Sequence, residues 1–323
     1  MQSANELSQE RIKEKLGPTT LWRKVVYLPT TGSTNDVAKN LAAQGSPEGT
    51  VVMADEQTAG RGRMGRGWLA PPATCLLCSI LLRPTLPPIQ AQRLTMLCAL
   101  AAADAVEESA GLRVYLKWPN DLVVKAQSPK PKAQNWRKLA GVLTETGVTG
   151  EQLEFVIVGI GINVNVEPER LSTLAPAATS ILTERGRPVD RVTLLIALLS
   201  GVEQRYTALR AGENPHQEWA ARLATLGQPV KATTSAGVLT GVAESVDEDG
   251  ALLLRTMDGA LHRLAAGDVT LTRSGATHFC RQSACSTVQS TASTTASTRG
   301  GARSRLLDKI AEMARDKCVA PYD

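Results

Sequence analysis

The apolar residues of this chain fall mostly into short runs, each closed by glycine, proline or polar residues. Short runs bounded in this way are typical of strands, whereas longer segments with a 3.6-residue period are typical of helices. We expect strands at 22–28, 50–55, 75–82, 112–117, 122–125, 138–146 and 153–166. We expect helices at 5–16, 33–44, 88–110 and 191–209. The first two thirds of the chain therefore combine both kinds of element.

The pattern changes at residue 227. Five short β-type runs follow at 229–233, 237–245, 251–256, 260–264 and 269–272, separated by glycine and aspartate turns. This spacing predicts a small barrel. After residue 273 the pattern stops, and ten of the sixteen residues from 283 to 298 are Ser or Thr. Such a stretch buries too little apolar surface to order itself, so we expect 274–323 to be a disordered tail with a short amphipathic helix at 304–317.

Composition excludes several classes of protein. No apolar stretch approaches the ~18 residues of a membrane-spanning helix, and the first residues lack the apolar core of a secretory signal. Six cysteines in 323 residues are too few for a disulfide scaffold and fit a reducing compartment, so we expect a cytoplasmic protein. The net charge of +5 permits an anionic ligand without indicating nucleic acid.

The segment with the strongest chemical signal is the loop 60–67, which carries four glycines and three arginines. Glycine lets the backbone approach a ligand closely, and guanidinium groups suit carboxylates and phosphates. We expect the three like charges to repel one another and keep the loop open until an anion orders it. The segment lacks the Gly-Lys-Ser/Thr ending of a Walker loop.

Three other segments place polar residues or glycines at the ends of expected strands: 117–121 (KWPND), 138–145 (KLAGVLTE) and 159–165 (GIGINVN). Lys117 is a candidate phosphate contact, and Asp121 a candidate ligand for magnesium or a ribose hydroxyl. Lys138 heads an apolar strand, so its amine is a candidate to point inward. Glycines within a strand mark close approach of a ligand or another backbone, although this spacing is not the GxGxxG fingerprint.

The cysteines and histidines suggest no catalytic or metal site. Cys75 and Cys78 form a CxxC pair inside the apolar run CLLCSILL, with no second pair at zinc spacing. Buried core positions explain them better than a metal or redox site. The three histidines lie in polar segments without partners at useful spacing.

Taken in order, these segments resemble the motifs of the biotin protein ligases (biotin–[acetyl-CoA-carboxylase] ligases). The matching stretches are 33–36 (STND), 55–66 (DEQTAGRGRMGR), 117–121, 138–141 and 159–163. The resemblance runs from about residue 22 to residue 273, and 227–273 is similar to the family's small SH3-like domain. It implies an α+β fold in which a mixed β-sheet flanked by helices, like that of class II aminoacyl-tRNA synthetases and lipoate ligases, precedes an SH3-like β-barrel.

The resemblance divides the chain into four parts. They are a helical lead-in at 1–21, a catalytic domain at 22–226, the barrel at 227–273 and the tail at 274–323. It implies that the biotin carboxylate attacks the α-phosphate of ATP, giving biotinyl-5′-AMP and pyrophosphate. A lysine amine of a biotin carboxyl carrier protein domain then attacks the acyl group and releases AMP. ATP and biotin are the implied substrates, with Mg²⁺ as the implied cofactor.

The resemblance also implies the site residues. Those for biotin are Ser33, Thr34, Asn35, Gln57, Arg61, Arg63, Lys138, Gly141, Gly159 and Gly161. Those for ATP are Arg63, Arg66, Lys117, Asn120, Asp121, Lys138 and Asn163, with Asp121 also the metal ligand. Lys138 and Arg63 are the expected catalytic residues, because cations placed where negative charge develops stabilise a phosphoryl transition state. A loop that orders over the ligand would also protect the adenylate from water.

Two alternatives stay open at this point. A lipoate or octanoate ligase would share the fold, but polar side chains at 33, 34 and 57 suit a hydrogen-bonding ureido head better than an aliphatic chain. A nucleic-acid-binding protein built on the arginine loop would need stacking aromatics, and the chain has only two Phe and four Tyr.

Two departures from the family shape the expected partners. Some members carry an N-terminal winged-helix DNA-binding domain, whereas only about 21 residues precede the matching region here, so we expect a ligase that binds no DNA. Many members of the family are monomers or dimers, and nothing in the sequence separates the two states, so we expect a monomer or homodimer. The polar insertion 126–137 is expected to be an exposed hairpin, whose basic residues are candidate contacts for an acidic carrier domain.

Overall fold

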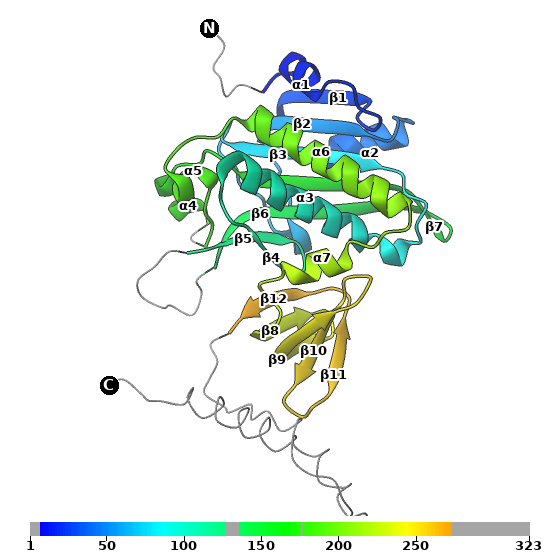
Figure 1. Ribbon diagram of the computed structural model, residues 1–323, viewed down its shortest axis with the longest axis vertical. Helices are drawn as coiled ribbons and strands as arrows, with labels where there is room; N and C mark the ends of the chain where they lie inside the picture. The colour runs from blue at the N-terminus through cyan, green and yellow to red at the C-terminus, as the bar shows by residue number, and fades with distance from the viewer. Residues whose placement is uncertain (1–6, 127–135, 176, 273–323) are drawn as a thin grey trace, which may run out of the picture. The chain divides into compact units, whose positions relative to one another are not determined.

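The computed structural model describes residues 7–126, 136–175 and 177–272 of the chain. Its larger sheet has seven strands in the order β1-β2-β3-β7-β6-β5-β4 (Figure 1). The strands are β1 (Lys24–Thr31), β2 (Thr50–Gln57), β3 (Cys75–Leu82), β4 (Tyr115–Lys117), β5 (Asp121–Lys125), β6 (Trp136–Thr149) and β7 (Gln152–Asn163). β1 and β2 are parallel and every other neighbouring pair is antiparallel. The expected mixed sheet is confirmed.

Helices cover both faces of this sheet. They are α1 (Gln9–Leu16), α2 (Thr34–Ala43), α3 (Gln92–Ala110), α4 (Pro168–Leu174), α5 (Ile181–Arg185), α6 (Arg191–Arg210) and α7 (His216–Ala221). Because neighbouring residues of a strand point to opposite faces, β2 serves two cores. Val52 packs with Ala38 and Ala42 of α2. Val51 and Met53 belong to the larger core, which contains α3 and α6.

The strand β3 lies in the middle of the sheet and is buried along its whole length. A strand covered on both faces needs a continuous apolar sequence, which CLLCSILL provides. The interpretation of Cys75 and Cys78 as buried residues is therefore confirmed. Burial raises the pKa of the Cys75 thiol to about 11 and that of Cys78 to about 12, so both are neutral at neutral pH.

A second sheet follows near the C-terminus, with five antiparallel strands in the order β11-β10-β9-β8-β12. They are β8 (Pro229–Thr234), β9 (Gly237–Val246), β10 (Leu252–Thr256), β11 (Leu261–Leu264) and β12 (Asp268–Leu271). All five expected runs are strands, with ends within about one residue of those expected. The described residues all belong to one compact unit, so the boundaries at 22, 227 and 273 stay predictions.

Other expected elements differ from the structure in length, and some observed elements were not predicted. The expected strand 112–117 is shortened to β4, and the short helices α4, α5 and α7 were not predicted because they carry too few turns for a periodic pattern. Most of the insertion 126–137 and the whole tail lie outside the described residues, although β5 and β6 pair antiparallel on either side of the insertion.

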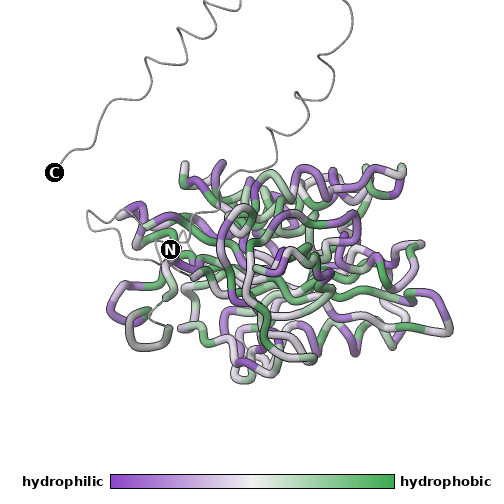
Figure 2. The backbone as a smooth tube through the Cα atoms, turned by 90° about the horizontal axis from the view of Figure 1, so that it is seen from below, coloured by the Kyte–Doolittle hydropathy of each residue, from purple (hydrophilic) through white to green (hydrophobic). Residues whose placement is uncertain are grey.

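Figure 2 shows hydrophobic segments running through the interior and hydrophilic ones concentrated in the outer loops. Within the described residues, no helix is long and apolar enough to cross a membrane.

Candidate active site

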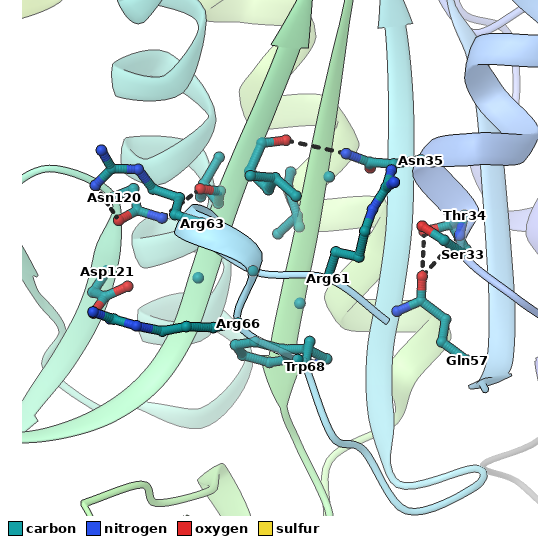
Figure 3. Close-up of a pocket in the computed structure, with 18 of the residues that line it drawn as sticks. Ser33, Thr34, Asn35, Gln57, Arg61, Arg63, Arg66, Trp68, Asn120 and Asp121 are labelled. Atoms are coloured by element: carbon teal, nitrogen blue, oxygen red, sulfur yellow. Dashed lines mark hydrogen bonds between the residues drawn. The ribbon is translucent and has the colours of Figure 1, made fainter. Parts of the chain in front are cut away.

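A cavity that is open to solvent on one side lies where the arginine loop crosses the larger sheet. Its polar and charged lining residues include Ser33, Thr34, Asn35, Gln57, Arg61, Arg63, Arg66, Asn120, Asp121, Lys138 and Asp268. Gly141, Gly159, Gly161 and Trp68 complete much of its wall. Figure 3 shows Ser33, Thr34 and Gln57 on one side, and Arg63 and Arg66 on the other, near Asn120 and Asp121.

The polar end of the cavity is built where the parallel strands β1 and β2 end. Ser33 is the N-cap of α2, but its hydroxyl makes no capping hydrogen bond. Gln57, the last residue of β2, accepts hydrogen bonds through Oε1 from the Thr34 backbone N–H at 2.8 Å and from Thr34 Oγ1 at 3.0 Å. The carboxyl ends of parallel strands meet at one edge of a sheet, which explains why residues so far apart in sequence meet here.

Asn35, which follows Thr34 on α2, adds its side chain to this polar end. Its side chain is buried, and the Ser79 hydroxyl lies 2.6 Å from its Oδ1. Gly159 makes room for it, since a Cβ there would meet Asn35 Oδ1 at 2.2 Å. The absence of a side chain at 159 therefore admits a protein side chain, whereas the sequence suggested close approach of a ligand or another backbone.

Glu145 joins the polar end to the loop. Its carboxylate accepts hydrogen bonds from Asn35 Nδ2 at 2.7 Å and from Lys39, and it lies 3.2 Å from Arg61 Nη2. Arg61 also contacts Asp36 at 2.6 Å. Burial alone would raise the pKa of Glu145, but the hydrogen bonds from Lys39 and Asn35, with the nearby charges, hold it below its ordinary value.

The arginine loop is closed in this structure, contrary to the expectation that like charges would keep it open. The Gly62 N–H donates to the Arg66 carbonyl at 2.7 Å, and the Trp68 N–H donates to the Gly60 carbonyl at 2.9 Å. Met64 at the turn adopts a left-handed conformation with φ of 56°. Acceptors elsewhere in the protein hold the arginines, so their mutual repulsion does not decide the conformation.

The two other arginines of the loop meet the C-terminal sheet. Arg66 pairs with Asp268, and Arg63 donates to the Gly267 carbonyl at 3.1 Å and lies 3.5 Å from Asn120 Oδ1. Burial lowers the pKa of the Arg63 guanidinium, against the attraction of Asp268 and Asp121. The hydrogen bond to Asp268 raises that of Arg66. Both remain positively charged at neutral pH.

Lys138 points into the cavity from β6. Its Nζ lies 2.7 Å from Asp121 Oδ1 and 5.6 Å from the centre of the Trp68 ring. The pairing of β5 with β6 shifts register between Leu122 and Val123, next to this lysine. Such bulges often re-aim side chains beside functional sites. The sequence expectation that the amine points inward is therefore confirmed.

Two glycines that face each other across β6 and β7 flatten the floor of the cavity. A Cβ on Gly161 would meet Trp68 Cε2 at 2.7 Å, and a Cβ on Gly141 would meet Trp68 Cζ3 at 3.3 Å. The indole therefore lies against this strip of bare backbone. Its Nε1–H is buried and has no hydrogen-bond partner among the described residues.

Two of the expected nucleotide contacts are not in the cavity wall. Asn163 is buried, and its Nδ2 donates to the Thr179 carbonyl at 3.0 Å, so its side chain is used within the fold. Lys117 lies on β4, the edge strand, and does not line the cavity either. The structure brings the other expected site residues together around one cavity.

Sequence reasoning missed four residues that shape the site: Trp68, Ser79, Glu145 and Asp268. Trp68 carried a usable signal, since an aromatic residue directly after a glycine-arginine loop is placed to pack on a ligand. The acidic residues carried a weaker one, because buried or crowded arginines need anionic partners. Nothing in the sequence indicated which acids those would be.

Comparison with known protein families agrees with this geometry. Residues 27–163 match the Biotin/lipoate A/B protein ligase family, and residues 225–271 match the Biotin protein ligase C terminal domain. The first match covers the large sheet from β1 to β7, and the second covers the five-stranded sheet. Biotin and lipoate ligases share the first family, whereas the second is particular to biotin ligases.

Individual relatives give the same result. The chain is 34% identical over 269 residues to the Bifunctional ligase/repressor BirA of Bacillus subtilis, covering 82% of this chain and 79% of that one. It is similar in structure to a biotin protein ligase from Aquifex aeolicus in complex with biotin and ATP, with a TM-score of 0.62 and 29% identity, over 78% of this chain and all of that one. It is 36% identical over 235 residues to the Biotin–[acetyl-CoA-carboxylase] ligase of Paracoccus denitrificans, covering 71% of this chain and 92% of that one. The chain belongs to the biotin protein ligase family.

Proposed function

We propose that the chain activates biotin with ATP and transfers the biotinyl group to a lysine of a biotin carboxyl carrier protein domain. One observation carries the proposal. A single cavity holds a neutral hydrogen-bonding end at Ser33, Thr34 and Gln57 and a cationic end at Arg63, Arg66 and Lys138. These ends suit a ligand with a polar uncharged head and a carboxylate that must meet a phosphate.

In the first step, the biotin carboxylate attacks the α-phosphorus of ATP, and the bond to pyrophosphate breaks. Two anions must approach each other, so the main task of the protein is to neutralise charge where it develops. Lys138 is placed for this role, because its amine enters the cavity beside Asp121. Arg63, the most enclosed arginine of the loop, supplies the second cation.

In the second step, the lysine amine of the carrier attacks the acyl carbon of biotinyl-5′-AMP, and AMP leaves. The adenylate is a mixed anhydride that water hydrolyses, so it must be shielded until the carrier arrives. The closed hairpin from Gly60 to Trp68 supports that role, since it covers the cavity from one side.

Asp121 is the proposed Mg²⁺ ligand. Mg²⁺ is usually bound through one or two carboxylates together with substrate phosphates, so such a site needs no dense cluster of protein ligands. Asp121 meets this description, because it lies in the cavity wall beside the cationic residues. Bound there, Mg²⁺ would neutralise phosphate charge, while Lys138 gives up part of its pairing with Asp121.

The alternatives receive less support. An octanoyl or lipoyl chain would offer no hydrogen-bonding group to the polar end of the cavity formed by Ser33, Thr34 and Gln57. A nucleic-acid surface would display the loop arginines, but Arg61 and Arg66 are turned toward Asp36 and Asp268.

The test is ATP–pyrophosphate exchange with magnesium and, in parallel, biotin, lipoate or octanoate. We expect exchange with biotin alone. Exchange with lipoate or octanoate instead would keep the fold and overturn the substrate, and no exchange with any of them would overturn the adenylation proposal. A cytoplasmic location, the absence of DNA binding, a monomeric or homodimeric state and the nucleotide contacts of Lys117 and Asn163 remain predictions.

A further inference from the structure

An ion pair between Arg191 and Asp55 lies where the segment 58–74, which contains the arginine loop, joins the larger sheet, and neither residue lines the cavity. Arg191 is the first residue of α6, and its side chain is 2% exposed. Its Nη1 lies 2.6 Å from Asp55 Oδ1, near the end of β2. α6 thus sends a charged side chain toward the sheet at the point where the chain leaves β2 for the loop.

The same two residues also contact the segment by which the chain returns from the loop to the sheet, at the start of β3. The same Nη1 donates to the carbonyl of Cys75 at 3.2 Å, and Cys75 is the first residue of β3. The backbone carbonyl of Asp55 accepts from the Ala73 N–H at 3.1 Å, and its carboxylate accepts from the Tyr27 hydroxyl at 2.7 Å. One guanidinium therefore ties the outgoing strand to the returning strand.

The segment that leads back into β3 contains a residue in a strained backbone conformation. Ala73 adopts a left-handed conformation with φ of 59°, which costs free energy for any residue with a Cβ. A strained residue of this kind persists only when its surroundings fix it. The hydrogen bond between Ala73 and Asp55, with Arg191 behind it, supplies that constraint.

We infer that the Asp55–Arg191 pair is a positioning device, which holds the base of the loop so that Arg61, Arg63 and Trp68 stand over the cavity. Neither residue lines the cavity, so the pair acts through the loop. The consequence for catalysis rests on the proposed function: a loosened base would let water reach the adenylate. Arg191 lies outside all the motifs found in the sequence and belongs to a different element.

The competing explanation is that the pair contributes only to global stability. The chain offers a matched control on the same helix, because Arg205 pairs with Asp104 at 2.6 Å and with Glu218 at 2.7 Å near the other end of α6. Arg191→Met and Arg205→Met each remove one paired arginine from α6 and keep an unbranched side chain. Only the first change affects the base of the loop.

The experiment measures amide hydrogen exchange of the full chain without ligand, peptide by peptide, for both variants. In Arg191→Met we expect exchange of residues 58–74 to rise by about tenfold or more, with exchange of the C-terminal sheet unchanged. In Arg205→Met we expect exchange of 58–74 as in the unaltered protein. Arg191→Lys keeps the charge but has fewer donors, so its loop should exchange at an intermediate rate.

A second readout is the release of AMP in the presence of biotin and ATP and the absence of a carrier protein. It should rise in Arg191→Met relative to the rate of pyrophosphate exchange. Unchanged exchange of 58–74 in folded Arg191→Met, or an equal rise in Arg205→Met, would overturn the inference. If Arg191→Met does not fold, unaltered loop exchange in Arg191→Lys would overturn it. The hydrogen exchange result stands even if the unaltered protein shows no biotin-dependent reaction, so failure of the proposed function is recognised separately.

Discussion

The two ends of the cavity are held in place in different ways. At the polar end, Thr34, Asn35 and Ser79 are buried and hydrogen-bond to one another or to Gln57. At the cationic end, the guanidinium of Arg66 is mostly exposed, and its partner Asp268 is a carboxylate that a phosphate can replace. The difference is what the proposed function would require: a rigid polar end for the neutral head of biotin and an exchangeable cationic end for phosphate.

The largest effect is expected at the cationic end, from Lys138→Ala. The side chain is 38% exposed, so its removal should change the free energy of unfolding by no more than about 1 kcal/mol. Adenylation should fall by about a hundredfold or more, because a cation that stabilises developing charge is lost. Pyrophosphate exchange and thermal unfolding measure the two effects. Full activity in the folded variant would remove Lys138 from the mechanism.

A substitution at the polar end should instead lower the stability of the protein, and biotin affinity with it. In Gly159→Ala the new Cβ would displace the amide of Asn35 from its place beside Ser79. We expect the free energy of unfolding to fall by about 2 kcal/mol, since buried polar groups lose partners, and biotin affinity to fall by about tenfold or more. Denaturant unfolding and biotin titration measure these changes.

Gly32→Ala is the matched control for that substitution, because a Cβ at Gly32 meets nothing within 4 Å. It should leave both quantities nearly unchanged. If the two variants lose equal stability, the polar end is not the rigid network described here.

Acid should weaken the contacts by which Glu145 joins the polar end to Arg61 of the loop. Its pKa is held below the ordinary value of 4.5, so it stabilises the fold above that pH and ceases to do so as the pH falls through the folded-state pKa. Glu145→Gln should therefore lower the free energy of unfolding by about 1 kcal/mol near neutral pH and by much less in strong acid. Chemical unfolding across pH tests this, and a pH-independent difference would contradict it.

The smallest effect is expected from Asp268→Asn. The pair with Arg66 is largely exposed, and such pairs contribute about 0–1 kcal/mol. Unfolding monitored with and without added salt should show a difference in this range that shrinks as salt screens the pair. A loss as large as that of Gly159→Ala would show that the cationic end is as firmly built as the polar end.

Much of the fold was predictable because local signals agreed with the tertiary structure. The run CLLCSILL predicts a buried strand, and Gly111 ends α3 in the left-handed conformation that glycine adopts readily. The strand order was not predictable from the residues alone. Nothing in a strand's own sequence says that β3 pairs with β7, or that β1 and β2 are parallel.

The candidate site shows the same division. The segment 60–67 was recognisable by its glycine and arginine content, and 138–141 by a lysine at the head of an apolar strand. The structure brings these segments together. The partners that fix them were not recognisable, because Glu145, Asp268 and Arg191 are ordinary charged residues in their own segments. Their role arises only from distances that the folded chain creates. The open loop expected from like-charge repulsion was wrong for this reason.

The strip of bare backbone at Gly141 and Gly161 has a consequence for what the protein accepts. Side chains that line a site can switch rotamer and so adapt to ligands of different thickness, whereas the backbone of two central strands has no such freedom. Here the indole of Trp68 lies directly on this strip, so main-chain atoms fix how deep the ring sits in the cavity. A change in the range of accepted acids would thus require changes in the loop that carries Trp68, because the strands beneath it cannot adapt.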